Sequence, residues 1–302
     1  MRRIRLFCLL PLVAVLFVTC AEPVISSISS GPRIPRIDDD TAISIITWNI
    51  REIDANVTQK TKDRVQLIMD SLDADFYCLQ EIEQKSALQD IVDNLDRYSA
   101  IISNETRYDH LAIVYKNTSF LPVLTEDLFK NDDYNFAGRP PLMVNFVYSV
   151  GADEHILNLI DLHMKCCEAN PSDLERRHAA TNMLQEWLRD KLAWGDSNFV
   201  VVGDWNDDIY DSDGSGEYAF EALLEDPENF YFVTDSLAAT GTARNSSYPS
   251  WPSFLDNILI SESLFDEYKN STVEVLRLDE VFGDYSSVVS DHRPVLWSFT
   301  PN

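Results

Sequence analysis

Basic residues are scarce in this sequence. Its 302 residues include 24 lysines and arginines against 50 aspartates and glutamates, which gives a formal net charge of −26. Such an acidic excess argues against a general affinity for polyanions, because most of the surface repels them. A phosphate-containing substrate would have to be bound locally, by a metal ion or by a few arginines and lysines. The apolar content of 45% still permits an ample core.

Cysteine is also sparse, and no Cys/His spacing resembles a zinc site. Two of the five cysteines, Cys8 and Cys20, fall in the N-terminal segment. Of the other three, Cys78 lies in an apolar strand and is expected to be buried, whereas Cys166 and Cys167 are adjacent. Three cysteines permit one disulfide at most and leave at least one thiol.

The hydrophobic run near the N-terminus is too short to span a bilayer. It extends from Leu6 to Val18 and follows a basic segment with three arginines, an arrangement that predicts an export signal over residues 1–20. Cys20 resembles the lipidated cysteine of a bacterial lipoprotein, although Phe17 and Thr19 are unusual residues at such a site. The alternative is ordinary cleavage directly after this segment.

Both alternatives predict an exported protein. A lipidated Cys20 would make it an outer-membrane or periplasmic lipoprotein, whereas cleavage near Ala21 would make it a secreted protein. Residues 21–42 are rich in proline, serine and aspartate, a composition that predicts a flexible tether without a core. The folded domain is expected over residues 43–302.

Strand-like and helix-like patterns alternate from Ile43 onward, with no internal repeat and no further linker. Short apolar runs predict strands over Ile43–Asn49, Asp75–Glu81, His110–Tyr115, Leu142–Tyr148, His155–His163, Phe254–Ile260 and Pro294–Phe299. Apolar residues at helical spacing predict helices around Val65–Leu72, Leu88–Leu95 and Phe220–Leu224, and a long helix that begins at Pro171–Asp173. Strands dominate, and we predict one α+β domain.

At the centre of this pattern lies Asn198–Asp208, a buried-strand pattern that ends in Gly203-Asp204-Trp205-Asn206. Such a strand holds a carboxylate and a carboxamide on a rigid base, which suits a hard cation or an oriented water. Other predicted strands are also flanked by polar residues, at Asn49, Glu81, His163, Asp256, Asp291 and His292. If the sheets bring these residues together, they form the equipment for metal-assisted hydrolysis.

Six motifs carry a family resemblance. In chain order they are Thr47-Trp48-Asn49-Ile50-Arg51, Leu79-Gln80-Glu81-Ile82, Asp161-Leu162-His163-Met164-Lys165, Val202-Gly203-Asp204-Trp205-Asn206, Leu255-Asp256-Asn257-Ile258-Leu259 and Ser290-Asp291-His292-Arg293-Pro294-Val295. In this order they resemble the endonuclease/exonuclease/phosphatase superfamily, which has the fold of pancreatic-type deoxyribonuclease. The resemblance covers residues 43–300. It implies a four-layer α/β sandwich, in which helices flank two mainly antiparallel sheets.

The resemblance also implies a metal site and a group that activates water. Glu81, supported by Asn49, would hold a divalent cation, and Asp291 would lie close to it. The cation is expected to be magnesium, with manganese as the alternative. Asp204 would orient or deprotonate the attacking water, and Asn206 would hold that water or the phosphate.

Two histidines and two arginines would act on the phosphate. His292 would contact the scissile phosphate while Asp256 fixes its tautomer, and His163 would assist the leaving oxygen. Arg51 and Arg139 match arginines that contact phosphate, for which the guanidinium fork is suited. The structural alternatives are a capped core histidine at position 163 and a surface residue beside a proline turn at position 139.

Two further features leave alternatives open. Lys165, Arg176 and Arg177 form either a small basic rim or a solvated helix start. The acidic loop Asp207–Gly216 has the spacing of a calcium loop, but Ala222 stands where a bidentate glutamate is needed. The loop is therefore either a structural calcium site or a solvated acidic loop.

These observations predict an exported, divalent-metal-dependent phosphodiesterase, with a nuclease as the first interpretation. The alternative is a sphingomyelinase-like phospholipid or inositol-phosphate phosphoesterase of the same superfamily. A non-catalytic surface binding protein would have lost catalytic positions, and none is lost here. The expected partners are a nucleic acid or another phosphodiester substrate and, through a lipid on Cys20, a membrane. We expect a monomer.

Overall fold

The structure, a computed structural model, describes residues 33–37, 41–104, 106–166, 171–210 and 219–302. The predicted export signal, most of the tether, Cys167 and residues 211–218 of the acidic loop lie outside these ranges. The prediction of lipidation and the two interpretations of the acidic loop therefore stay untested, whereas Cys78 is a free cysteine and is buried, as expected. Within the described ranges, no helix has the length and apolar character needed to cross a membrane.

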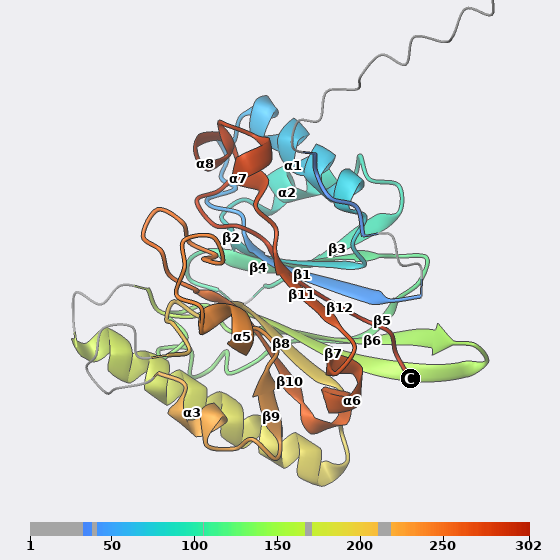
Figure 1. The fold of residues 1–302 in the computed structure, drawn as a ribbon, viewed down its shortest axis with the longest axis vertical. Helices are drawn as coiled ribbons and strands as arrows, with labels where there is room; N and C mark the ends of the chain where they lie inside the picture. The colour runs from blue at the N-terminus through green and yellow to red at the C-terminus, as the bar shows by residue number, and fades with distance from the viewer. Residues whose placement is uncertain (1–32, 38–40, 105, 167–170, 211–218) are drawn as a thin grey trace, which may run out of the picture. The chain divides into compact units, whose positions relative to one another are not determined.

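Two six-stranded sheets face each other (Figure 1). The first has the order β11-β12-β1-β2-β4-β3 and the second β5-β6-β7-β8-β10-β9. Only the β1–β2 and β7–β8 pairs are parallel, so both sheets are mainly antiparallel, as predicted. The strands are β1 Ile43–Asn49, β2 Phe76–Ile82, β3 Tyr98–Ile102, β4 His110–Lys116, β5 Leu121–Asp127, β6 Leu142–Val150, β7 Asp153–His163, β8 Phe199–Asp204, β9 Phe230–Phe232, β10 Asp256–Ser261, β11 Thr272–Val275 and β12 Val295–Phe299.

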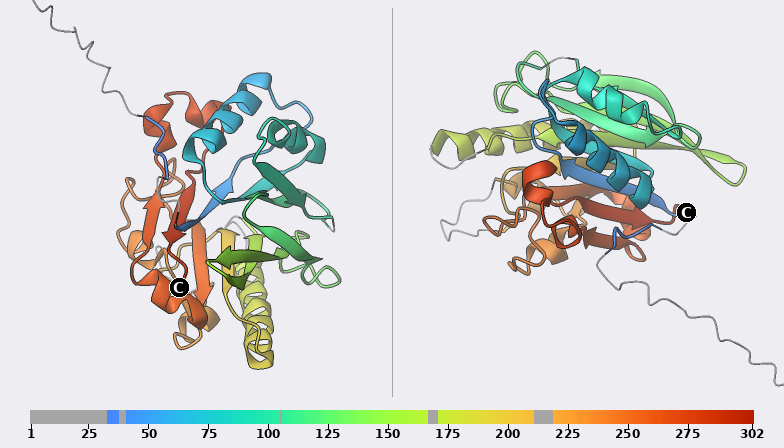
Figure 2. Two further views of the ribbon diagram at one scale, coloured as in Figure 1. Left: turned by 90° about the vertical axis from the view of Figure 1, so that its right-hand side faces the viewer. Right: turned by 90° about the horizontal axis from the view of Figure 1, so that it is seen from above.

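Helices cover the outer face of each sheet and complete four layers (Figure 2). Period-2 alternation sends Ile45 of β1 into the core between the sheets and Ile46 outward, under the helices. Helix α1 packs on the first sheet, and α3, through Leu184 and Leu188, packs on the second. The helices are α1 Gln59–Leu72, α2 Lys85–Val92, α3 Pro171–Trp194, α4 Glu221–Leu224, α5 Asp235–Ala238, α6 Phe265–Tyr268, α7 Leu278–Val281 and α8 Tyr285–Val288. The predicted four-layer sandwich is confirmed.

The four strands that the sequence patterns did not predict are the four sheet edges. β3 and β11 flank the first sheet, and β5 and β9 flank the second. β9 has 3 residues and β11 has 4, and β5 is mostly exposed. Edge strands are commonly short or exposed, so they lack the long apolar run that identifies a central strand.

Gly203 allows the two central strands of the second sheet to approach each other where the site begins. Its φ is +148°, and a Cβ at this position would lie 1.9 Å from the carbonyl oxygen of Leu162. Only glycine tolerates both this backbone conformation and this contact. The approach continues one residue further along the parallel ladder, where His163 pairs with Asp204. The Gly-Asp step thus aligns an imidazole with a carboxylate.

Candidate active site

The polar strand ends meet in one cleft of about 590 Å³. Eight of the ten predicted site residues line it, and the other two, Asn49 and Asp256, lie behind it and hydrogen-bond to lining residues. Because β1 and β2 are parallel, and β7 and β8 are also parallel, each pair carries its polar residues to the same end. The eight lining residues are Arg51, Glu81, Arg139, His163, Asp204, Asn206, Asp291 and His292.

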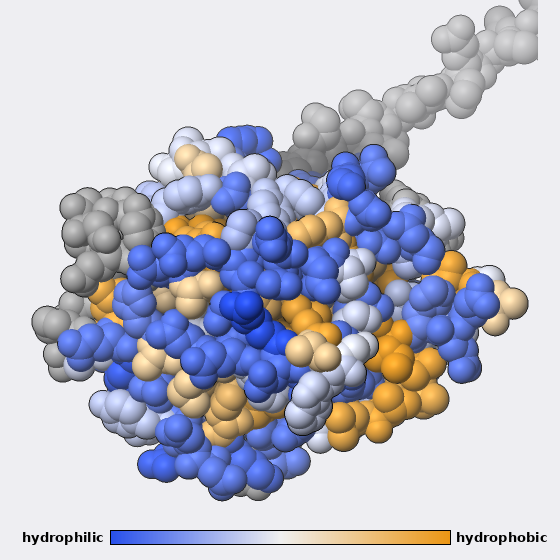
Figure 3. Space-filling model, turned by 90° about the horizontal axis from the view of Figure 1, so that it is seen from below, coloured by the Kyte–Doolittle hydropathy of each residue, from blue (hydrophilic) through white to orange (hydrophobic). Residues whose placement is uncertain are grey.

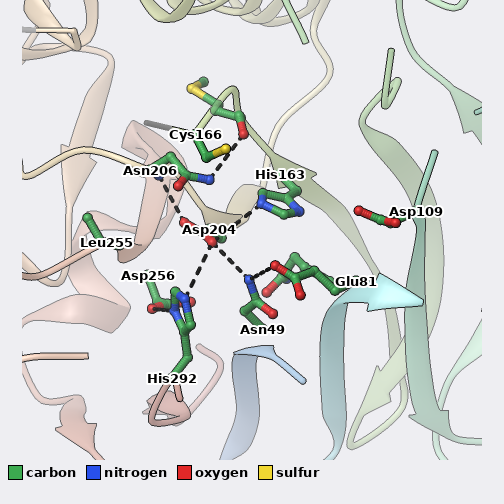
Figure 4. A network of polar contacts seen from close by, with 12 residues as sticks. Asn49, Glu81, Asp109, His163, Cys166, Asp204, Asn206, Leu255, Asp256 and His292 are labelled. Atoms are coloured by element: carbon green, nitrogen blue, oxygen red, sulfur yellow. Dashed lines mark hydrogen bonds and ion pairs between the residues drawn. The ribbon is translucent and has the colours of Figure 1, made fainter. Parts of the chain in front are cut away.

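Asp204 lies at the centre of the network (Figure 4). Its Oδ2 accepts a hydrogen bond of 3.0 Å from Nδ2 of Asn49, and its Oδ1 accepts one of 2.9 Å from the backbone amide of Asn206. Nε2 of His163 lies 3.5 Å from Oδ2, and Nε2 of His292 lies 3.9 Å from it. Burial raises the pKa of Asp204 to about 6, although His292 opposes the shift. The carboxyl is thus suited to accept a proton near neutral pH.

His292 is held by a buried carboxylate. Its Nδ1 lies 2.8 Å from Oδ2 of Asp256, which is 0% exposed. Burial alone would lower the pKa of His292, but Asp256, Asp204 and Asp291 raise it to about 10. His292 is therefore an imidazolium at neutral pH, and its Nε2 is the nitrogen nearer to Asp204.

His163 has the opposite charge state. The imidazole is buried, and this burial, followed by repulsion from Arg139 and His292, holds its pKa well below the ordinary value. It is therefore neutral at neutral pH. Among the described residues, its Nδ1 has no hydrogen-bond partner. Because the ring also lines the cleft, His163 is more than a core residue. Two imidazoles in different charge states beside one carboxylate are an acid–base arrangement.

Carboxylates gather at the other end of the cleft, and this end fits a divalent cation. Glu81 and Asp291 line it together with Asp109, Glu52 and Glu83. Burial raises the pKa of Glu81, and the nearby carboxylates of Asp109 and Asp291 raise it further, against an opposing hydrogen bond from Asn49. A hard cation would relieve this repulsion, and carboxylate oxygens are its preferred ligands.

Two of the predicted ligands at this end, Asn49 and Glu81, are hydrogen-bonded to each other. Nδ2 of Asn49 donates to Oε1 of Glu81 over 2.8 Å, and Oδ1 of Asn49 accepts from the backbone amide of Arg51 over 3.0 Å. Asn49 therefore orients Glu81 and Asp204, and the carboxylates are left to face a cation.

A second candidate set of ligand atoms comes from Asp204, Asp256 and His292, whose side-chain ligand atoms lie within 4.8 Å of one another. Nδ1 of His292 and Oδ2 of Asp256 are already bonded to each other, at 2.8 Å. A cation at this set would have to compete with that bond. The carboxylate end requires no such exchange, but among the described residues only Asp204, Asp256 and His292 bring three ligand atoms this close together. The assignment of Glu81 and Asp291 as metal ligands stays a prediction.

The two predicted phosphate-binding arginines differ in accessibility. Arg139 is buried, and its guanidinium donates to the carbonyl oxygens of His163 and Met164. It lines the cleft, so it is not a surface residue beside a turn. Arg51 is exposed at the rim, where one nitrogen donates to the carbonyl oxygen of Ser286. Phosphate binding stays a prediction for both, and Arg51 is the more accessible.

Six residues that line the cleft are not among the predicted site residues: Glu52, Glu83, Asp109, Cys166, Tyr248 and Leu255. Asp109 directly precedes β4, and Tyr248 lies with its ring centroid 4.9 Å from that of His292. Neither belongs to a motif, although Asp109 shares the signal of a polar residue flanking a strand. Arg177 is 1% exposed and pairs with Asp207 at 3.0 Å, so neither a basic rim nor a solvated helix start describes it.

Comparisons with known proteins identify a family and a similar fold. The model of a family described as the endonuclease/exonuclease/phosphatase family matches residues 46–292. Truncated TDP2 from Caenorhabditis elegans is similar in structure, with a TM-score of 0.61 and 16% identity over 86% of this chain and 98% of that one. The APE2 catalytic domain from Xenopus laevis gives 0.61 and 18% identity, over 85% and 92% of the two chains.

A third similar structure is TDP2 from D. rerio in complex with a single-strand DNA product. It gives a TM-score of 0.60 and 16% identity over 87% of this chain and 100% of that one. Identities this low establish the fold alone. Among curated proteins, none matches this chain.

Proposed function

The chain belongs to the endonuclease/exonuclease/phosphatase family and is a metal-dependent phosphoester hydrolase, and we propose that it cleaves phosphodiester bonds of nucleic acid. One observation carries the proposal. Asp204, with its pKa raised to about 6, lies between a protonated His292 and a neutral His163, at a cleft whose other end is rich in carboxylates. That arrangement separates a base, a cationic hydrogen-bond donor and a metal site.

The proposed mechanism assigns a task to each side chain. Asp204 accepts a proton from the attacking water, which the side chain of Asn206 orients. His292, as the imidazolium, donates a hydrogen bond to a phosphate oxygen on which negative charge develops. Attack of the water forms a new P–O bond and breaks the bond to the leaving oxygen, which His163 contacts and which takes up a proton from solvent water. Asp256 keeps Nδ1 of His292 protonated through their 2.8 Å contact, so Nε2 is the atom that faces substrate.

Glu81 and Asp291 would hold a divalent cation, and that ion would supply positive charge that stabilises the phosphate. We propose magnesium, because the facing ligands are all oxygens, and expect manganese to substitute. Asn49 positions Glu81 for this task and Asp204 for the attack, through the two hydrogen bonds of its Nδ2. One amide thus fixes the distance between the metal site and the base.

Nucleic acid is favoured as the substrate by likeness in fold to a structure that holds a single-strand DNA product. The net charge of −26 limits the number of phosphates that the chain can bind without repulsion. The face drawn in Figure 3 is largely hydrophilic. We propose that only a short stretch of a strand is held, near Arg51. The alternative substrates are phospholipids and inositol phosphates.

The test is a substrate panel. Purified protein is assayed with magnesium on single-stranded DNA, duplex DNA, RNA, sphingomyelin and inositol phosphates. We expect cleavage of DNA or RNA, with weak dependence of binding on salt because few phosphates are neutralised. Turnover of sphingomyelin or inositol phosphates without cleavage of any nucleic acid would contradict the proposal and favour the lipid or inositol alternative.

We also propose that the protein is exported and anchored through Cys20, on the basis of the N-terminal sequence. A lipid on Cys20 would place the protein in the membrane fraction of cells that express it. The variant Cys20→Ser is expected to move to the soluble fraction, while Cys8→Ser, a control within the same segment, stays with the membrane. Wild-type protein found only outside the cell in soluble form would contradict anchoring.

A further inference from the structure

A second polar cluster lies below the cleft, between the two sheets. Gln80 on β2 and Asp161 on β7 are each 0% exposed, and Nε2 of Gln80 donates to Oδ1 of Asp161 over 2.6 Å. The same Nε2 lies 3.3 Å from Oγ1 of Thr47 on β1. β1 and β2 belong to the first sheet and β7 to the second. The hydrogen bond between Gln80 and Asp161 therefore bridges the sheets.

The two bridging residues are the near neighbours of site residues. Asp161 precedes His163 by two positions on β7, so both side chains point to the same face of the strand. Gln80 directly precedes Glu81, where β2 bulges and φ is +63°. The bulge turns Glu81 into the cleft while Gln80 stays between the sheets. A shift of the bridge would therefore move Glu81 and His163 relative to each other.

Two oxygen atoms of this bridge lack partners. Oε1 of Gln80 and Oδ2 of Asp161 are buried, and neither finds a hydrogen-bond partner in the described part of the chain. An ionised Asp161 would leave both oxygens as unsatisfied acceptors and would also bury a charge, which is costly. A protonated Asp161 has one O–H group. Its Oδ2 then becomes a donor, and Oε1 of Gln80 can accept from it.

The electrostatics of Asp161 agree with the protonated form. Burial raises its pKa well above the ordinary value, and hydrogen bonds from Gln80 and from the backbone amides of Ala112 and Leu162 offset only part of this shift. No lysine, arginine or histidine contributes to the shift. A neutral carboxyl beside a neutral amide needs no counter-ion.

We propose that Gln80 and Asp161 form a neutral amide–acid pair that joins the two sheets and fixes the separation of Glu81 from His163. Both are positioning residues, because neither lines the cleft. The inference rests on the proposed phosphodiester hydrolysis for its kinetic readout and on the proposed metal site for its binding readout. It requires a neutral hydrogen-bonding side chain at position 161, and a negative charge is dispensable there.

The test compares two substitutions of one residue. Asp161→Asn supplies an N–H donor in place of the carboxyl O–H and should keep kcat within about threefold of wild type on bis(4-nitrophenyl) phosphate with magnesium. Asp161→Leu keeps the number and branching of the side-chain heavy atoms but cannot pair with Gln80. Since a displacement of about 1 Å can cost about a hundredfold in rate, its kcat should fall by at least thirtyfold with little change in KM.

A control on the same strand separates positioning from stability. Asn158 on β7 is 4% exposed and hydrogen-bonds to Asn145 within the second sheet, away from the cleft. Asn158→Leu should lower the melting temperature while kcat changes less than about threefold, because no site residue depends on this bond. Asp161→Leu should have a melting temperature close to that of the control but a large loss of kcat, so the loss would not come from lower stability.

Manganese affinity, measured by calorimetry, gives a readout that does not need turnover. Asp161→Leu should bind Mn²⁺ about tenfold more weakly, the scale typical of lost support for a metal ligand, and Asp161→Asn should bind it as wild type does. If the wild type did not hydrolyse the substrate but the three proteins showed this pattern of Mn²⁺ affinity, the proposed activity would be refuted and the proposed pair upheld. If Asp161→Leu and Asp161→Asn had the same kcat or the same Mn²⁺ affinity, the proposed pair would be refuted.

Discussion

Replacing Asp204 with asparagine is expected to lower turnover by about two to four orders of magnitude, the range for loss of a positioned acid–base group. The change keeps the side-chain volume and can keep Oδ1 as acceptor for the amide of Asn206. It removes the only carboxylate that lies within 4 Å of both cleft histidines among the described residues. Far-UV circular dichroism should be unchanged, so the loss would be chemical and not a failure to fold.

The pH dependence of the wild type gives a second readout on the same residue. Asp204 must be ionised to accept a proton, so the rate should rise with pH through about 6, where Asp204 loses its own proton. His292 must be protonated, so the rate should fall as pH approaches about 10. Asp204→Asn should lack the acid limb. Its matched control is Asp75→Asn at the start of β2, where the carboxylate accepts from Ser44 away from the cleft. Equal rates for Asp204→Asn and this control would refute the assignment of the base.

The residues of the site were easier to predict from the sequence than their environment. Asp204 and His163 each end a strand with a strong apolar pattern, and Glu81 is the residue before the last of another. The order of their motifs matches a known superfamily. Their charge states depend instead on burial and on neighbours distant in the chain. Burial lowers the pKa of both histidines, but Asp256 contacts only His292 of the two and, with other carboxylates, raises its pKa, so the two differ in protonation.

The edge strands and the buried polar pairs could not be predicted in the same way. The edge strands lack a distinct apolar run, and the buried role of Arg177 depends on Asp207, which is 30 residues away. Asp161 belongs to a motif, but in the sequence it reads as one more acidic residue. Its neutral pairing with Gln80 follows only when β2 and β7 are placed in facing sheets. Long-range contacts of this kind carry no local signal.

Removal of divalent metal is expected to abolish turnover and leave the fold in place. Burial is the main cause of the raised pKa of Glu81, and the carboxylates of Asp109 and Asp291 add to it. The proposed chemistry needs a cation among these groups. These side chains lie near the ends of strands. Buried apolar residues between the sheets and under the helices stabilise the bodies of those strands. A chelator should therefore stop hydrolysis while far-UV circular dichroism stays the same, and added Mg²⁺ or Mn²⁺ should restore the rate.

The same experiment makes a thermodynamic prediction. A cation that binds only the folded chain stabilises it by about 2.7 kcal/mol when its concentration is a hundred times the dissociation constant, so chelation should lower the melting temperature. Since protons compete for Glu81, whose pKa is raised, metal affinity should weaken as pH falls toward the acid range. Glu81→Gln should lose most of the metal-dependent shift in melting temperature, whereas Asp190→Asn on the exposed face of α3 should keep it. Full activity in chelator, or an equal shift in both variants, would show that the carboxylate end of the cleft is not the metal site.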